Sequence, residues 1–182
     1  MSGRLTARVL AVDDRKENLL ALQAILEGLP IVVDSVTSGE DALKRLLVDD
    51  YAVILLDAHM PGMDGFETAG HVKQRERTRH IPILFLTAVD YDPHLAFRGY
   101  QAGAVDYITK PFDPWVLRSK VSVFVDLWAT TNRLAQQAAE CGALRAAVDG
   151  ALAVLDDPEA QDDPAAALER ARARLESVRS TL

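Results

Sequence analysis

Four stretches of the sequence each place a charged or hydroxyl side chain directly after, or close after, an apolar run. The acidic pair Asp13 and Asp14 follows the run at 9–12, and Asp57 follows the run at 53–56. Thr87 follows the run at 83–86, and Lys110 comes shortly after the run at 105–108. Any one of them alone is typical of a helix cap or a turn. Together they make a set of three carboxylates, one hydroxyl and one ammonium group, which could do chemistry if the fold brings them together.

The charges of this set indicate the chemistry. Three neighbouring carboxylates repel one another unless a cation lies among them. Oxygen ligands without a cysteine or histidine cluster favour a hard ion, Mg²⁺ before a transition metal. Lys110 and Thr87 suit an anion, because one neutralises charge and the other donates a hydrogen bond. A carboxylate placed there can attack phosphorus to form an acyl phosphate, and Asp57 is the best nucleophile because it ends the most apolar run.

The elements that must position these residues alternate along the chain. Short apolar runs predict five strands, over residues 9–12, 31–36, 53–56, 83–86 and 105–108. Helical spacing and capping residues predict helices at 18–29, from Ser38, at about 65–76, from Asp92 to Tyr100, and from Asp113 onward. This alternation predicts a doubly wound α/β domain over residues 5 to about 128, with parallel strands. In such a sheet the site lies outside the carboxyl ends of the strands.

The same residues resemble a known family. Residues 5 to about 125 are similar to the receiver domain of two-component response regulators. The matching residues are Asp13-Asp14, Asp57 within LLDAHMPGMDG, Thr87-Ala88 and Lys110-Pro111-Phe112. The resemblance implies a flavodoxin-like, five-stranded parallel sheet of order 2-1-3-4-5. It also implies that the chain accepts a phosphoryl group from a cognate histidine kinase, a phosphotransfer protein or a small phosphodonor.

The resemblance implies a metal site among the acids. Asp14, Asp57 and the backbone carbonyl of His59 would ligate Mg²⁺, and Asp13 would help, partly through water. Phosphatases of the haloacid-dehalogenase type also combine an aspartate nucleophile with Mg²⁺. They need a second aspartate two positions on, where this chain has His59. That alternative therefore fails.

The resemblance also implies how the phosphoryl group is held and how the domain responds. Thr87 and Lys110 would contact the phosphoryl oxygens, and a cis peptide bond would join Lys110 to Pro111. Tyr107 occupies the family's aromatic switch position, three residues before Lys110. The chain would phosphorylate and dephosphorylate only itself, so we do not expect an enzyme acting on a separate substrate.

Composition narrows the remaining function classes. The chain has 182 residues and a net charge of −7, which is not the footprint of a nucleic-acid-binding protein. A single cysteine, Cys141, rules out an internal disulfide and fits a cytoplasmic protein. No apolar run is long enough to span a bilayer, so no membrane partner is expected.

The C-terminal part of the chain reads as helical. One heptad row is apolar at Leu127, Leu134, Cys141, Val148 and Leu155. This row predicts a coiled-coil-like helix that ends near Leu155, and Asp163-Pro164 opens a last amphipathic helix. We therefore divide the chain into a receiver domain at 1–126 and a helical extension at 127–182. Two such hairpins make a four-helix bundle, so we expect a homodimer through 127–182, with a parallel coiled coil as the other arrangement.

Several outputs remain open. The chain fits a small regulator whose extension docks an unknown effector protein. It fits equally the N-terminal receiver module of a longer signalling enzyme, such as a hybrid kinase or a phosphatase. A nucleic-acid-binding regulator is a minority alternative, because the residues from Pro114 onward hold eight Lys or Arg against ten Asp or Glu. A histidine-phosphotransfer bundle is excluded, because no histidine follows His94.

Overall fold

The computed structural model describes residues 6–87, 106–156 and 163–179. Its strands are β1 (Ala7–Val12), β2 (Ile31–Val36), β3 (Val53–Asp57), β4 (Ile83–Thr87) and β5 (Asp106–Thr109). Its helices are α1 (Lys16–Leu26), α2 (Gly39–Val48), α3 (Gly65–Gln74), α5 (Pro114–Leu155) and α6 (Pro164–Arg179). Ala88 and the helix predicted from Asp92 to Tyr100 lie outside the described residues.

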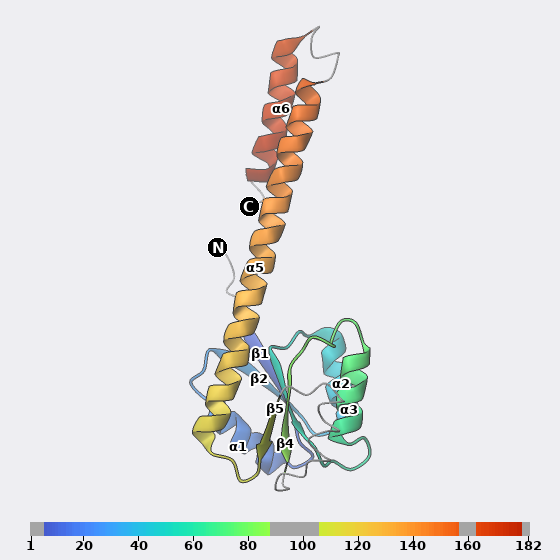
Figure 1. The fold of residues 1–182 in the computed structure, drawn as a ribbon, viewed down its shortest axis with the longest axis vertical. Coiled ribbons are helices and arrows are strands. Elements are labelled where there is room, and N and C mark those ends of the chain that lie inside the picture. The colour runs from blue at the N-terminus through green and yellow to red at the C-terminus, as the bar shows by residue number, and fades with distance from the viewer. Residues whose placement is uncertain (1–5, 88–105, 157–162, 180–182) are drawn as a thin grey trace. The chain divides into compact units, whose positions relative to one another are not determined.

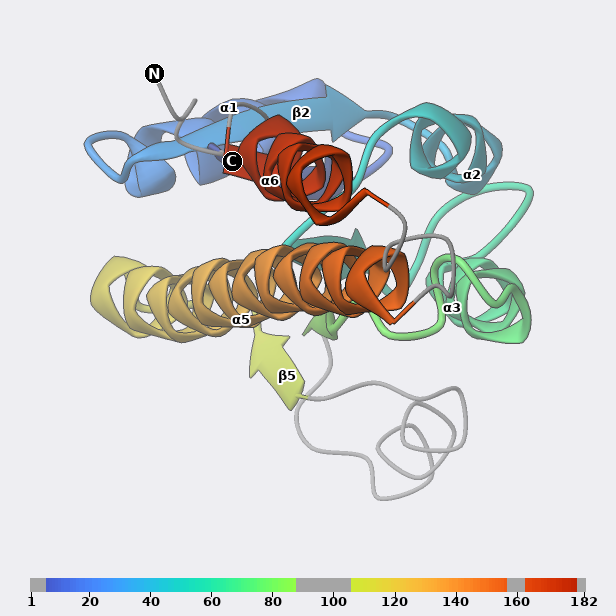
Figure 2. The same cartoon turned by 90° about the horizontal axis from the view of Figure 1, so that it is seen from above.

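The five strands form one parallel sheet in the order β2-β1-β3-β4-β5, with β2 and β5 at opposite edges (Figures 1 and 2). This confirms the predicted doubly wound fold. The register pairs Asp57 with Leu86, and Thr87 with Thr109. The carboxyl ends of β3, β4 and β5 therefore meet at one edge of the sheet.

Helices cover both faces of the sheet (Figure 1). On one face, α1 and the first turns of α5 bury Leu19, Leu22, Leu26, Leu117, Val121 and Val125. On the other face, α2 and α3 bury Ala42, Leu46, Ala69 and Val72. Every residue of β3 is buried. Because each buried large apolar side chain contributes about 1.5–3 kcal/mol, the central strands are firmly fixed and hold the residues at their ends in place.

Side-chain caps fix where two of these helices begin. The Ser38 hydroxyl accepts a hydrogen bond from the Asp41 backbone N–H at 3.1 Å, and α2 begins at the next residue. The Asp64 carboxylate accepts one from the Glu67 N–H at 2.7 Å at the start of α3. Both helices carry acidic residues in their first turns, which the helix dipole favours. The prediction that Ser38 opens a helix is thus confirmed.

Helix α1 ends three residues earlier than its predicted end at residue 29. It stops at Leu26, and Gly28 adopts a left-handed φ of +82°, which favours glycine. Arg118 of α5 donates hydrogen bonds to the carbonyls of Ile25 at 3.1 Å and Glu27 at 2.6 Å. These bonds satisfy carbonyls at the end of α1 and tie it to α5.

A buried tyrosine helps to hold the edge strand β2. The Tyr51 hydroxyl donates to the Asp34 carboxylate at 3.0 Å, and the Arg8 guanidinium donates to the same oxygen at 2.8 Å. Burial, followed by the bond to Asp34, raises the pKa of Tyr51 to about 12. This cluster joins β1, β2 and the residue two before β3.

Gly65 lets α3 start directly against the end of β3. Its N–H donates to the Ala58 carbonyl at 3.2 Å. A Cβ at this position would lie 2.1 Å from the Asp57 carbonyl oxygen and 2.9 Å from the Ala58 Cα. Only a residue without a side chain fits there, so Gly65 fixes the path of the chain around Asp57.

The contacts divide the chain into two compact units, Met1–Ala129 and Thr130–Leu182, and α5 contributes to both. In the second unit, the C-terminal part of α5 and α6 lie side by side as an antiparallel hairpin (Figures 1 and 2). The Asp163 carboxylate accepts a hydrogen bond from the Ala166 N–H at 3.1 Å and caps α6, as predicted. Among the described residues, no helix combines the length and apolar character needed to cross a membrane.

Candidate functional site

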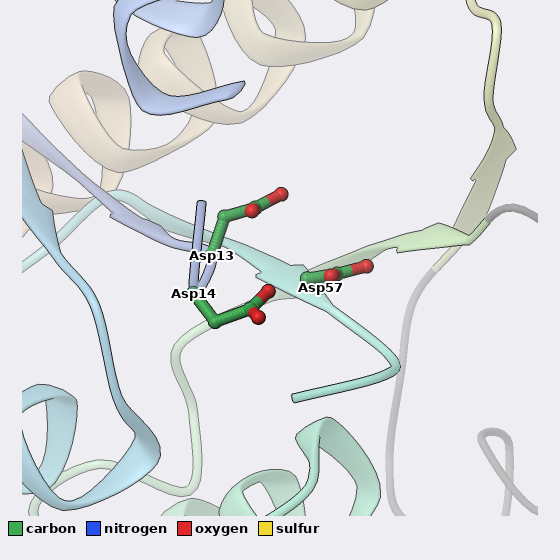
Figure 3. A group of neighbouring side chains, drawn as sticks. All are labelled: Asp13, Asp14 and Asp57. Atoms are coloured by element: carbon green, nitrogen blue, oxygen red, sulfur yellow. The ribbon is translucent and has the colours of Figure 1, made fainter. Parts of the chain in front are cut away.

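Three carboxylates come together at the carboxyl edge of the sheet. Asp13 and Asp14 follow β1, and Asp57 is the last residue of β3. Their carboxylate oxygens lie within 4.8 Å of one another (Figure 3). Asp13 and Asp57 are buried, whereas Asp14 is exposed. Because β1 and β3 are neighbours in the sheet, the fold places these acids side by side.

Lys110 bridges the two buried acids. Its ammonium nitrogen lies 2.8 Å from Asp13 Oδ2 and 3.2 Å from Asp57 Oδ1. Its backbone N–H donates to the Thr87 carbonyl at 2.6 Å, directly after β5 pairs with β4. The Lys110–Pro111 peptide bond is cis, as the resemblance implied.

Asp13 is already saturated by donors from its own chain. Its carboxylate accepts hydrogen bonds from the Arg15 backbone N–H at 2.9 Å and from the Asn18 side-chain amide at 2.9 and 3.0 Å, besides Lys110. Asn18 is a site residue that the sequence reasoning missed. The signal was available, because Asn18 precedes the buried Leu22 by one helical turn and so lies on the core-facing side of α1.

Asp57 lies in an environment that opposes its negative charge. Burial raises the pKa of the Asp57 carboxyl, and the charge of Asp13 adds to that shift. The Lys110 ammonium and a hydrogen bond from the His59 backbone N–H act in the opposite direction. The net shift is upward, so further positive charge beside Asp57 would stabilise its ionised form.

Thr87 and Tyr107 take positions on the strands next to β3. Thr87 ends β4, one residue beyond the partner of Asp57 in the register. Tyr107 in β5 pairs with Phe85, and their rings stack with centroids 5.6 Å apart. Phe85 in turn contacts Phe66 of α3, with centroids 4.8 Å apart. Tyr107 therefore belongs to an aromatic row on the side of the sheet that α3 covers.

Comparisons with known proteins agree with this geometry. The profile of the family described as the response regulator receiver domain matches residues 9–122. The chain belongs to this family. Response regulator PleD of Caulobacter vibrioides is 36% identical over 152 residues, which are 84% of this chain and 33% of PleD. Sensor histidine kinase GacS of Pseudomonas protegens is 35% identical over 136 residues, which are 73% of this chain and 15% of GacS.

Solved receiver-like structures match the first unit. Chemotaxis protein CheY4 of Vibrio cholerae has a TM-score of 0.62 at 30% identity, covering 65% of this chain and 98% of CheY4. A response regulator described as putative from Chloroflexus aurantiacus also has a TM-score of 0.62, at 33% identity and with 66% and 98% coverage. These findings confirm the predicted family and fold. The part of this chain that matches PleD spans about a third of the length of PleD.

The acids of the receiver fit a hard divalent cation. The donor set consists of oxygens only, and the exposed Asp14 offers an approach from solvent. Because nitrogen donors already occupy both oxygens of Asp13, the open ligand positions lie on Asp14 and Asp57. Asp13 would then contact a cation through water, and the carbonyl of His59 is the predicted backbone ligand.

Proposed function

We propose that the receiver accepts a phosphoryl group on Asp57 in a Mg²⁺-dependent reaction. The observation that carries this proposal is Asp57 at the buried end of β3, with the Lys110 ammonium 3.2 Å away and two further carboxylates within 4.8 Å. The donor would be a phosphohistidine of a cognate kinase or phosphotransfer protein, or a small phosphodonor. The chain modifies only itself, so it is not an enzyme that acts on a separate substrate.

The residues of the chain each have a defined task in this transfer. An Asp57 carboxylate oxygen attacks phosphorus and forms an acyl phosphate, while the bond from phosphorus to the donor breaks and its electron pair leaves with the donor. The Lys110 ammonium neutralises charge on the phosphoryl oxygens, and the Thr87 hydroxyl donates a hydrogen bond to one of them. When bound by Asp14, Asp57 and the His59 carbonyl, with Asp13 through water, Mg²⁺ would supply the remaining charge neutralisation.

The response to phosphorylation would pass through Thr87 and Tyr107. A Thr87 side chain drawn toward a phosphoryl oxygen changes the space available to the Tyr107 ring. That ring packs on Phe85 in this structure. The proposed switch is therefore a change in how Tyr107 packs, and it alters the surface formed by β5 and the first turns of α5.

The helical extension would deliver the output. We place the receiver at about 1–126 and the extension at 127–182, and we propose that the extension joins two copies of the chain and docks an effector protein. A second candidate is a receiver module within a longer signalling protein. It is favoured by the small share of PleD and GacS, 33% and 15%, that the similarity covers. In either case the proposed location is the cytoplasm.

The proposed function is tested with acetyl phosphate and Mg²⁺. Intact-mass measurement should find one added phosphoryl group on the full chain, and hydroxylamine should remove it, because an acyl phosphate reacts with that nucleophile. Asp57→Ala should abolish the addition. Asp50→Ala removes an exposed acid that forms an ion pair with Arg77, and it should leave the addition unchanged. Stable, hydroxylamine-sensitive modification of the Asp57→Ala protein would disprove the assignment.

A further inference from the structure

The hairpin of α5 and α6 buries alanines and leaves its leucines exposed. Ala147 and Ala151 of α5 are 9% and 6% exposed, and Ala167 and Ala171 of α6 are 1% and 4% exposed. We call these four residues the alanine seam. Small side chains let two helix backbones approach closely, and the buried hydrophobic residues of the described part of this hairpin are all alanines.

An arginine fixes the register of this seam. Arg174 of α6 donates a hydrogen bond to the Gly150 carbonyl of α5 at 3.2 Å. A Cβ at Gly150 would lie 2.9 Å from the Arg174 guanidinium nitrogen. The absence of a side chain at Gly150 therefore makes room for this hydrogen bond between the two helices.

Three large apolar residues of the hairpin each follow a seam alanine by one position. Val148 follows Ala147, Leu152 follows Ala151, and Leu168 follows Ala167. One residue is a rotation of about 100°, and because the two helices are antiparallel, this rotation brings both rows to the same side of the hairpin. Leu144, Leu155 and Leu175 lie three, four or seven residues from these three on the same helices and extend their rows. The leucine face consists of Leu144, Val148, Leu152, Leu155, Leu168 and Leu175, which are 41–62% exposed.

The opposite side of the hairpin has no comparable surface among the described residues. The positions one before the seam or register residues are small or charged: Ala146, Gly150, Ala166, Arg170 and Ala173. The hairpin is thus two-sided, with large apolar side chains on one side and small or charged residues on the other. A contiguous exposed apolar surface of this kind is typical of an interaction site.

We propose that the leucine face is covered by the leucine face of a second copy of this chain, forming a four-helix bundle. The inference rests on the proposed homodimer and names the surface that makes it. Each copy offers two parallel apolar rows on neighbouring helices, so two copies related by a twofold axis match row against row. A single foreign helix would cover only the groove between them.

The heptad row, which shares Val148 and Leu155 with the leucine face, also favours a second copy. Leu134, Cys141, Val148 and Leu155 stand seven residues apart, and all four are exposed. A seven-residue repeat is the pattern with which helices of one sequence pair with each other. The row therefore continues the leucine face along α5 with the same spacing.

The area of the leucine face agrees with a dimer. Its six side chains expose on the order of 500 Å² per chain, near the largest apolar patch of an ordinary monomer, about 300–600 Å². Leu134 and Cys141 extend it toward the roughly 800 Å² that each partner contributes to a stable interface. Both signs of charge flank it, including Arg145, Asp149 and the Arg172–Glu176 pair, so two identical faces do not meet as like charges.

The test uses the full chain and measures its mass by light scattering. The unaltered chain should be dimeric at 10 μM. The double substitution Leu152→Arg and Leu168→Arg should weaken the dimer by at least about 100-fold, because two apolar contacts become buried charges. The matched control, Ala153→Arg and Ala173→Arg, adds the same charge to the opposite side of the hairpin and should remain dimeric. Circular dichroism verifies that both variants keep their helices.

Two results would overturn the proposal: a monomeric unaltered chain, or equal loss of the dimer in the face variant and in its control. Cys141 provides a second measurement. Its alkylation should be at least about ten-fold slower in the unaltered chain than in the leucine-face variant. Equal rates would contradict the proposed burial of this row between two copies of the chain. The Asp57→Ala chain separates this inference from the proposed function, because its failure to accept phosphate leaves the mass of the dimer measurable.

Discussion

At the scale of single residues, the site depends on one ammonium group, that of Lys110, which contacts two buried acids. The Lys110 ammonium lies within 3.2 Å of Asp57 and 2.8 Å of Asp13, and Asp13 is 0% exposed. Without Lys110, two neighbouring carboxylates would remain buried with little positive charge between them. Such loss of one partner in a buried ion pair is generally more costly than loss of an exposed pair.

The first prediction follows from this arrangement. Lys110→Ala should lower the free energy of unfolding by about 2 kcal/mol in the absence of divalent cations. Mg²⁺ should make this loss of stability smaller, because a cation held by the acids replaces the missing positive charge. Lys44→Ala is the control, because Lys44 pairs with Asp41 on the surface and should cost less than about 0.5 kcal/mol. Urea titrations with and without Mg²⁺ measure both, and equal losses in the two variants would contradict the assigned role of Lys110.

The second prediction concerns Tyr51, whose pKa rises to about 12, chiefly through burial. A group whose pKa is higher in the folded state than its ordinary value of 10.0 contributes its full stabilisation below pH 10.0. This contribution is lost as the pH rises toward 12. Tyr51→Phe removes the ionisable group. Between pH 10 and 12, the free energy of unfolding of this variant should therefore fall by about 2 kcal/mol less than that of the unaltered chain. Parallel slopes for the two proteins between pH 9 and 11.5 would refute the assignment.

At the scale of elements, the contact between β3 and α3 depends on Gly65. We predict that Gly65→Ala destabilises the receiver by more than about 2 kcal/mol and slows phosphorylation of Asp57, because the new Cβ would lie 2.1 Å from the Asp57 carbonyl. The matched control lies in the same helix: a Cβ at Gly70 meets nothing within 4 Å. Gly70→Ala should therefore stabilise α3 by about 0.5–1 kcal/mol. Thermal unfolding and the acetyl phosphate assay compare the two, and similar effects would contradict this explanation.

Sequence patterns predicted most of these elements, for identifiable reasons. The strands were visible because buried parallel strands are short apolar runs, and the polar residues that end them marked one edge of the sheet. Asn18 was missed because its role depends on a contact with Asp13 that only the folded α1 creates. The hairpin was predicted from leucine spacing, but the structure buries alanines in the seam instead. Pattern reasoning weighs hydrophobicity, whereas close approach of two backbones selects small side chains.

At the scale of the whole molecule, the two compact units should separate in function. The first ends at Ala129, and Trp128 packs partly on the receiver core, so a cut after residue 126 would remove a core contact. We predict that residues 1–129 accept phosphate at the rate of the full chain but are monomeric, because the leucine face is missing. Light scattering and intact-mass measurement on the same sample test both parts. A dimeric truncation would move the interface to the receiver itself.

Helix α1 is held at both ends by groups outside it. At its start, Asn18 donates to Asp13, and at its end Arg118 of α5 holds the carbonyls of Ile25 and Glu27. Because α1 is held at both ends, a displacement of Asp13 should shift this helix as one rigid element. Its amides should therefore exchange with solvent as one cooperative unit, and Arg118→Met should let the end fray first. These hydrogen bonds connect the acidic edge of the receiver, through α1, to α5.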